Sequence, residues 1–182
     1  MRFPLPSVPT SSYRGANGFG ANRDRVRQGL RHGAVDLFAR AGTPVLAIDE
    51  GTVTRGPYPF YSGTYALEVQ HPQFLARYGE IAARAEVEVG GFVQAGQVIA
   101  YVGNQPGYDM LHLEMYSGEE EGDLTQMGNR PFDRRKDLID PTPYVDRLTH
   151  TVANVEQAKY EFWTDKEGRK FLVASKKYLI DL

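Results

Sequence analysis

The chain has 182 residues, of which 41% are hydrophobic, and this is enough for one domain of ordinary size. Its net charge of -2 gives no reason to expect nucleic acid or an anionic membrane as a partner, and no segment has the ~20 apolar residues of a membrane span. Because the chain lacks cysteine, any metal must bind to His, Asp or Glu side chains. The histidines available are His32, His71, His112 and His150.

The N-terminal residues 1–22 are rich in Pro, Ser, Gly and Asn and are expected to form an irregular lead-in. They contain no apolar run of the kind found in a cleavable signal peptide. Residues 23–31 are basic and are expected to form one short helical turn. We expect a main domain over residues 23–148, followed by a C-terminal extension of unknown role over residues 149–182.

Short apolar segments alternate with turn residues through the main domain, which indicates an antiparallel sheet. The expected strands cover residues 35–38, 45–48, a segment from Thr52, 65–70, 74–81, a strand–glycine turn–strand unit over 87–102, and 110–116. Residues 119–135 are expected to form an exposed loop. A helix should begin near Pro143, and residues 160–164 and 170–174 should pair as a hairpin.

The strand over residues 110–116 carries two different faces, because residues two apart on a strand share one face. Leu111, Leu113 and Met115 form an apolar face suited to the core. The opposite face carries the imidazole of His112 and the carboxylate of Glu114. This second face is the candidate site of chemistry.

A second pair, His32 and Asp36, lies in the first expected strand region. Asp36 sits between Val35 and Leu37, and a buried carboxylate without a partner costs several kcal/mol. The partner is either a metal or a cation such as Arg31 or Arg40. His112 alone is also compatible with a structural, hydrogen-bonded histidine.

Two neutral imidazoles and one carboxylate form a known ligand set for catalytic zinc. His32, Asp36 and His112 supply that set, and zinc would lower the pKa of a water molecule and polarise a substrate carbonyl.

Three segments together resemble one protein family. The segments are RHGAVDLFARAGTPVLAIDEGTV, VEVGGFVQAGQVIAYVG and MLHLEMYSG. In this order and at these spacings they resemble the motif blocks of the lysostaphin-like (LytM-type) zinc endopeptidases, over about residues 14 to 145. The resemblance implies a mainly β fold with an antiparallel sheet and a groove, and it implies that His32, Asp36 and His112 bind zinc.

Two positions depart from the family pattern. Met110 stands where most members have the first histidine of a His-x-His pair, and Glu80 stands where they have a catalytic histidine after an Arg-Tyr pair. A carboxylate beside a metal centre is a workable acid–base group, so Glu80 is the candidate general base. The alternative is a site that binds zinc but hydrolyses poorly.

Four further side chains are weaker candidates. Glu114 would orient a ligand histidine by a hydrogen bond, or else face solvent. Tyr78, Tyr108 and Tyr116 would donate to a substrate carbonyl or oxyanion, or else serve only in packing. His71 is expected to be structural, and His150 to be exposed.

The resemblance implies an endopeptidase that cleaves peptide bonds in bacterial peptidoglycan, in stem peptides or in cross-bridges. The alternative is a zinc-binding cell-wall protein with a regulatory role. The variant motifs resemble those of members associated with phage and with secretion systems. We therefore expect a secreted or phage-associated hydrolase or toxin effector, acting in the periplasm or outside the cell, with peptidoglycan peptides and an immunity or delivery protein as partners.

Overall fold

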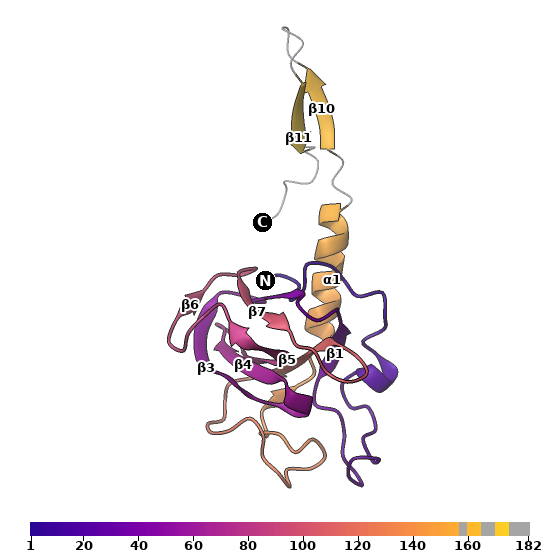
Figure 1. Ribbon diagram of the computed structural model, residues 1–182, viewed down its shortest axis with the longest axis vertical. Helices are drawn as coiled ribbons and strands as arrows, with labels where there is room; N and C mark the ends of the chain where they lie inside the picture. Colours follow the sequence, from indigo (N-terminus) through magenta and orange to yellow (C-terminus); the bar gives the residue numbers. More distant parts are fainter. Residues whose placement is uncertain (157–159, 165–169, 175–182) are drawn as a thin grey trace.

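The computed structural model describes the backbone of residues 1–156, 160–164 and 170–174, and the side chains up to residue 149. Within these residues the fold is mainly β and the strands pair antiparallel (Figure 1). One sheet has nine strands, and a separate sheet has two. The predicted fold class is thus confirmed.

The elements follow the expected order along the chain. The strands of the large sheet are β1 (Val35–Phe38), β2 (Pro44–Leu46), β3 (Gly51–Pro59), β4 (Tyr65–Gln70), β5 (Leu75–Ala85), β6 (Phe92–Val93), β7 (Val98–Val102), β8 (Met110–Tyr116) and β9 (Leu138–Ile139). The remaining elements are the 3-10 helices η1 (Gly15–Asn17) and η2 (Tyr61–Gly63), the helix α1 (Thr142–Glu156), and the hairpin strands β10 (Tyr160–Thr164) and β11 (Lys170–Ala174). The turn expected between β10 and β11 lies outside the described residues.

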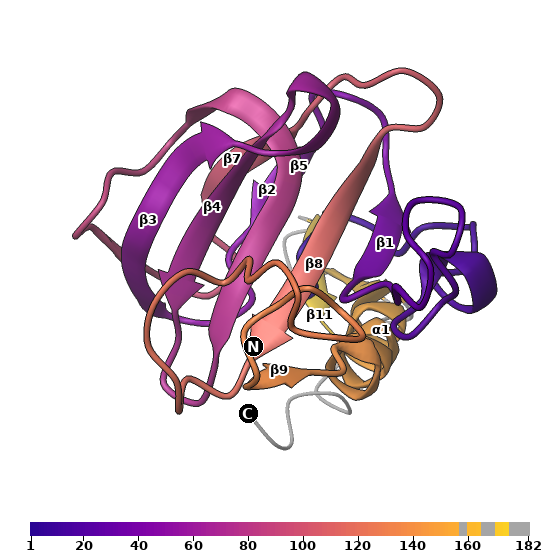
Figure 2. The ribbon, with the colours of Figure 1, turned by 90° about the horizontal axis from the view of Figure 1, so that it is seen from below.

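The large sheet has the order β1-β8-β5-β4-β3-β6, with β7 pairing with β5 and β2, and β9 pairing with β8 (Figure 2). One face packs on the core. Leu111, Leu113 and Met115 of β8 are fully buried there, as the alternation of this strand predicts. Val145 and Leu148 of α1 belong to the same core cluster. Helix α1 thereby anchors the chain after β9 by burying apolar surface.

The N-terminal segment contributes to this core. Phe3 and Leu5 are buried in it, and the Tyr13 hydroxyl donates to Asp146 of α1 at 2.6 Å. The expected boundary between the main domain and the C-terminal extension, at residue 148, lies within helix α1. No helix among the described residues is long and apolar enough to cross a membrane.

Of three local expectations, two are confirmed and one is wrong. Residues 23–31 contain one helical turn, in which the Arg27 N–H donates to the Arg23 carbonyl at 3.1 Å, and continue in further hydrogen-bonded turns. The segment over 87–102 contains the expected strand, glycine turn and strand, as β6, a turn at Gly96 and β7, although β6 pairs with β3 whereas β7 pairs with β2 and β5. The segment over 119–135 is not simply exposed, since it folds against the sheet and buries Leu124 and Arg134. The strand partners of β6 and β7 and the burial of residues 119–135 depend on contacts between residues distant in the chain.

Tyr78 belongs to the core, so its hydroxyl cannot contact a substrate. Its side chain is fully buried in the main cluster. Its hydroxyl accepts a hydrogen bond from the Ile48 amide at 2.9 Å. The hydroxyl also lies 3.0 Å from Nε2 of His71, whose Nδ1 lies 2.9 Å from the Glu50 carbonyl. The carbonyl can only accept, so Nδ1 donates to it and Nε2 accepts from Tyr78. His71 is therefore structural, as expected.

We predict that Tyr78→Phe lowers the free energy of unfolding by about 1–3 kcal/mol, because the buried Ile48 amide and the His71 ring lose their partner. Urea denaturation measures this change. Tyr108→Phe is the matched control, because the Tyr108 side chain is 70% exposed. Equal stability of the two variants would contradict the prediction.

Candidate metal centre

Strand pairing brings two of the predicted ligands together. Asp36 of β1 lies directly opposite His112 of β8, so their side chains emerge on the same face of the sheet. His32 lies just before β1, where its backbone N–H donates to the Ala21 carbonyl at 2.8 Å and its carbonyl accepts from Gly20 at 2.8 Å. Each of the three predicted ligands is thus placed by hydrogen-bonded backbone.

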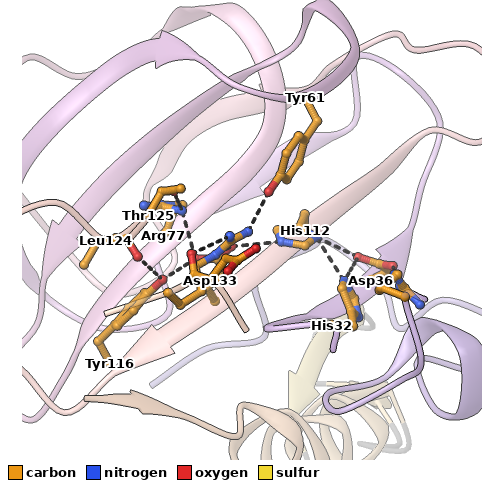
Figure 3. A network of polar contacts seen from close by, with 12 residues as sticks. His32, Asp36, Tyr61, Arg77, His112, Tyr116, Leu124, Thr125 and Asp133 are labelled. Carbon is orange, nitrogen blue, oxygen red and sulfur yellow. Dashed lines mark hydrogen bonds and ion pairs between the residues drawn. The ribbon is translucent and has the colours of Figure 1, made fainter. Parts of the chain in front are cut away.

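The three side chains converge on one point (Figure 3). Oδ1 of Asp36 lies 2.9 Å from Nδ1 of His112 and 3.2 Å from Nε2 of His32, and the two nitrogens lie 3.3 Å apart. Ligands about 2.0–2.2 Å from one tetrahedral ion are separated by roughly 3.3 Å. The separations therefore fit a small tetrahedral cation. All three residues are buried.

The outer ring nitrogens, which are the nitrogens of His32 and His112 that face away from the other two side chains, support the same interpretation. Nδ1 of His32 lies 2.9 Å from the Gly18 carbonyl, and Nε2 of His112 lies 3.1 Å from Oε1 of Glu114. When each outer nitrogen donates its hydrogen to these acceptors, a neutral ring turns a lone pair inward. Two lone pairs and a carboxylate then face one another, which is a donor set suited to a cation.

Glu114 is the fully buried centre of a charged network. Besides His112, it accepts a hydrogen bond from the Tyr116 hydroxyl at 2.5 Å, and it pairs with Arg77 at 3.0 Å and Arg134 at 2.8 Å. Burial alone would raise the pKa of Glu114, but Arg77 and Arg134 hold it far below its usual range. The carboxylate therefore stays ionised and orients the His112 ring.

This network continues across the sheet as a row of alternating charges. Arg55 of β3 is opposite Glu68 of β4, Glu68 is opposite Arg77 of β5, and Arg77 is opposite Glu114 of β8. Arg77 is 1% exposed, and its Nε, 3.7 Å from Glu68, has no hydrogen-bond partner among the described residues. The row fixes Arg77, which in turn fixes Glu114.

Glu80 reaches the site because of an irregularity in β5. Ala76, Tyr78 and Ile81 face the core, so the alternation skips one residue at Glu80. The pairing shifts there, since Gly79 is opposite Ala66 whereas Ile81 is opposite Tyr65. Such a bulge re-aims a side chain.

The backbone at this bulge is strained. Glu80 has a φ of 60°, which is rare for a residue with a side chain. Its carboxylate accepts a hydrogen bond from Gln105 at 2.5 Å, and burial raises its pKa above the usual value although His112 and Gln105 oppose this. A carboxyl with a raised pKa is better suited to accept a proton than a fully solvated one.

A cavity of about 430 Å³ opens over the candidate metal centre formed by His32, Asp36 and His112. Glu80, Met110, Tyr61 and Arg134 line it beside the three converging residues. Met110 thus lies beside the centre without offering an acid–base group. The Tyr61 hydroxyl accepts a hydrogen bond from Arg134 Nη2 at 2.9 Å, so its own proton remains available to a ligand in the cavity.

The other candidates are distributed differently. Tyr116 is buried behind Glu114 and lies outside the cavity, as does Tyr78. Tyr108 is exposed and packs edge-on against Phe38. The side chain of His150 lies outside the described residues.

Among the described residues, the arginine that pairs with Asp36 is one that the sequence did not suggest. Arg23, and neither Arg31 nor Arg40, is the charged partner of Asp36, at 3.6 Å. Tyr61 and Arg134 were missed because they lie in segments without a recognisable motif. The only available signal for Arg134 was its place in a basic run after a strand expected to carry the site.

Comparisons with known proteins agree with this architecture. The catalytic domain of lysostaphin from Staphylococcus simulans superposes with a TM-score of 0.56 at 23% identity, covering 74% of this chain and 92% of that chain. LytU superposes with a TM-score of 0.55 at 26% identity, covering 75% of this chain and 89% of that chain. These likenesses show a shared fold.

Sequence relatives point the same way. Lysostaphin from Staphylococcus staphylolyticus is 28% identical over 104 residues, which are 57% of this chain and 22% of that protein. The chain thus spans about a fifth of the length of the curated relatives it matches. Residues 30–124, more than half of the chain, match Peptidase family M23. With its lysostaphin-like sheet, this chain belongs to peptidase family M23.

Proposed function

We propose that this protein is a zinc-dependent endopeptidase that cleaves peptide bonds in bacterial peptidoglycan. The observation that carries the proposal is the convergence of His32, Asp36 and His112, with separations of 2.9–3.3 Å and both outer ring nitrogens paired. Membership of a peptidase family supplies the reaction class. The name lysostaphin, carried by relatives, supports a cell-wall substrate.

Different residues of this chain have different roles in the proposed hydrolysis. Zinc held by the three ligands would lower the pKa of a water molecule and polarise the scissile carbonyl. Glu80 accepts the proton of the attacking water and returns it to the leaving amine as the C–N bond breaks. Tyr61 donates a hydrogen bond to the developing oxyanion, with Arg134 holding its hydroxyl in place.

The buried position of Glu80 favours an enzyme over a zinc-binding regulator. A left-handed φ and a partly desolvated carboxylate both cost folding free energy. Strain of this kind is typically found at functional sites. We also propose that the protein acts at the cell wall, where its substrate is, and that an immunity or delivery protein accompanies it.

The function is tested by incubating zinc-loaded protein with purified sacculi and identifying released muropeptides by mass spectrometry. Release that depends on zinc and on Glu80 supports the proposal. Zinc binding without any released muropeptide, from sacculi of several peptidoglycan types, would leave the regulatory alternative.

We predict that His112→Ala lowers zinc affinity by at least ~100-fold and abolishes hydrolysis, because the site loses a ligand. Zinc at about 100 times its Kd should stabilise the wild type by about 2.7 kcal/mol and this variant hardly at all. Metal analysis and thermal unfolding with and without zinc measure both effects. His71→Gln, outside the metal centre, is the control and should retain zinc.

Zinc binding should also release about one proton near pH 7. Burial disfavours the charged His112 ring, but the hydrogen bonds to Asp36 and Glu114 raise the pKa of metal-free His112 to about 10. The ring therefore carries a proton that zinc must displace, and affinity should rise about tenfold per pH unit as pH increases toward that value. Calorimetry in two buffers of different ionisation enthalpy counts the protons. A pH-independent affinity between pH 6 and 9 would speak against this.

Glu80→Gln should retain zinc and lower kcat by about 10²–10⁴-fold, because the amide cannot accept the proton. Glu86→Gln, after the end of β5, is the matched control with unchanged kcat. A wild-type rate in Glu80→Gln would remove Glu80 from the mechanism.

A further inference from the structure

The cavity over the candidate metal centre is lined by several arginines. Four arginines and three carboxylates line it, and a bound dication would add to the positive excess. The charged residues are Arg23, Arg27, Arg31, Arg134, Asp36, Glu80 and Asp133. The cavity therefore favours an anionic ligand.

Three of these arginines already have carboxylate partners. Arg134 pairs with Glu114 at 2.8 Å, and Arg27 pairs with Asp133 at 3.0 Å. Arg23 lies 3.6 Å from Asp36. Each of these guanidinium groups is at least partly neutralised by the protein itself.

Arg31 differs from the other three. Its side chain is exposed at the cavity and makes no ion pair with any described residue. The charge of Arg31 contributes to lowering the pKa of Asp24. The two carboxylate oxygens of Asp24 nevertheless accept their hydrogen bonds from Asn22 at 2.7 Å and from the Gly29 amide at 2.7 Å. The Arg31 guanidinium therefore remains available to a ligand.

The backbone holds Arg31 next to the metal centre. Its N–H donates to the Pro131 carbonyl at 2.7 Å, which ties it to the loop that contributes Phe132 and Asp133 to the cavity. It directly precedes His32, so their Cα atoms are about 3.8 Å apart. Arg31 and the three converging side chains line the same cavity, so one bound peptide can contact both.

The rim beside Arg31 is apolar. Val26 is 75% exposed and Met127 is 67% exposed, and both line the cavity with Leu30 and Phe132. Exposed apolar side chains around a charged group suit a peptide that carries both methyl or methylene groups and an ionised carboxylate.

We propose that Arg31 binds a free carboxylate of the substrate close to the scissile bond. This inference deepens the proposed function and rests on it. It assigns the substrate to peptidoglycan stem peptides, which retain free carboxylates, and argues against neutral cross-bridges built of uncharged residues. Arginine is suited to this role because its guanidinium pairs with a carboxylate through two parallel hydrogen bonds.

The test uses pairs of synthetic stem peptides that differ only in a free carboxylate or a carboxamide next to the scissile bond. For the wild type we expect kcat/KM to be about twofold to fivefold higher for the carboxylate peptide, mainly through KM. The preference should shrink as ionic strength increases, because the pair is accessible to solvent. Arg31→Gln should abolish it.

Arg25→Gln is the matched control. Arg25 lies on the same turn-rich segment and is exposed, but it does not line the cavity. This variant has the same change of net charge and should retain the preference. A preference lost equally in both variants would indicate a long-range charge effect and overturn the assignment to Arg31.

A binding measurement tests this inference independently of the proposed function. Calorimetry with zinc-loaded Glu80→Gln compares the affinities of the two peptides without turnover. Equal affinities for carboxylate and carboxamide would overturn the inference even if the wild type cleaves both. Preferential binding of the carboxylate by a wild type that cleaves nothing would support the subsite and defeat the endopeptidase.

Discussion

The site depends on a fully buried carboxylate that must remain ionised. Glu114 has no exposure to water, and an ionised carboxylate in such a place is tolerated only with charged partners. Arg77 and Arg134 supply these partners, and the row of charges across β3, β4, β5 and β8 holds Arg77 in turn. The orientation of the His112 ring follows from this balance, because Glu114 accepts its outer N–H.

A second constraint on the site is the strained backbone at Glu80. The bulge in β5 turns Glu80 away from the core and into the cavity at the cost of a left-handed backbone. A regular strand would have placed this carboxylate on the face of Tyr78, among apolar side chains. The protein thus sacrifices local stability at the residue that we propose as the base, while the neighbouring core residues Tyr78 and Ile81 remain in place.

The charges that line the cavity bear on both the proposed reaction and the choice of substrate. The cavity combines a centre suited to a cation with an arginine wall, so both favour electron-rich groups of a peptide. The wall is assembled from the turns over 23–31 and the loop over 127–134, which are joined by Arg27 with Asp133 and by Arg31 with Pro131. Variation in such loops changes specificity without disturbing the sheet.

Much of this protein was predictable from its sequence. Alternation of apolar residues predicted the antiparallel strands and the two faces of β8, because side-chain direction along a strand is a local property. The buried setting of Asp36, the scarcity of histidine and the resemblance of the motif blocks together named the three residues that the structure brings together. Only the tertiary structure decided that Tyr78 lies in the core, that Arg23 approaches Asp36, and that Arg134 reaches Glu114 from a distant loop. It also decided the direction of Glu80, because a bulge depends on the register between two strands, and register is set by packing across the sheet rather than by neighbours in the chain.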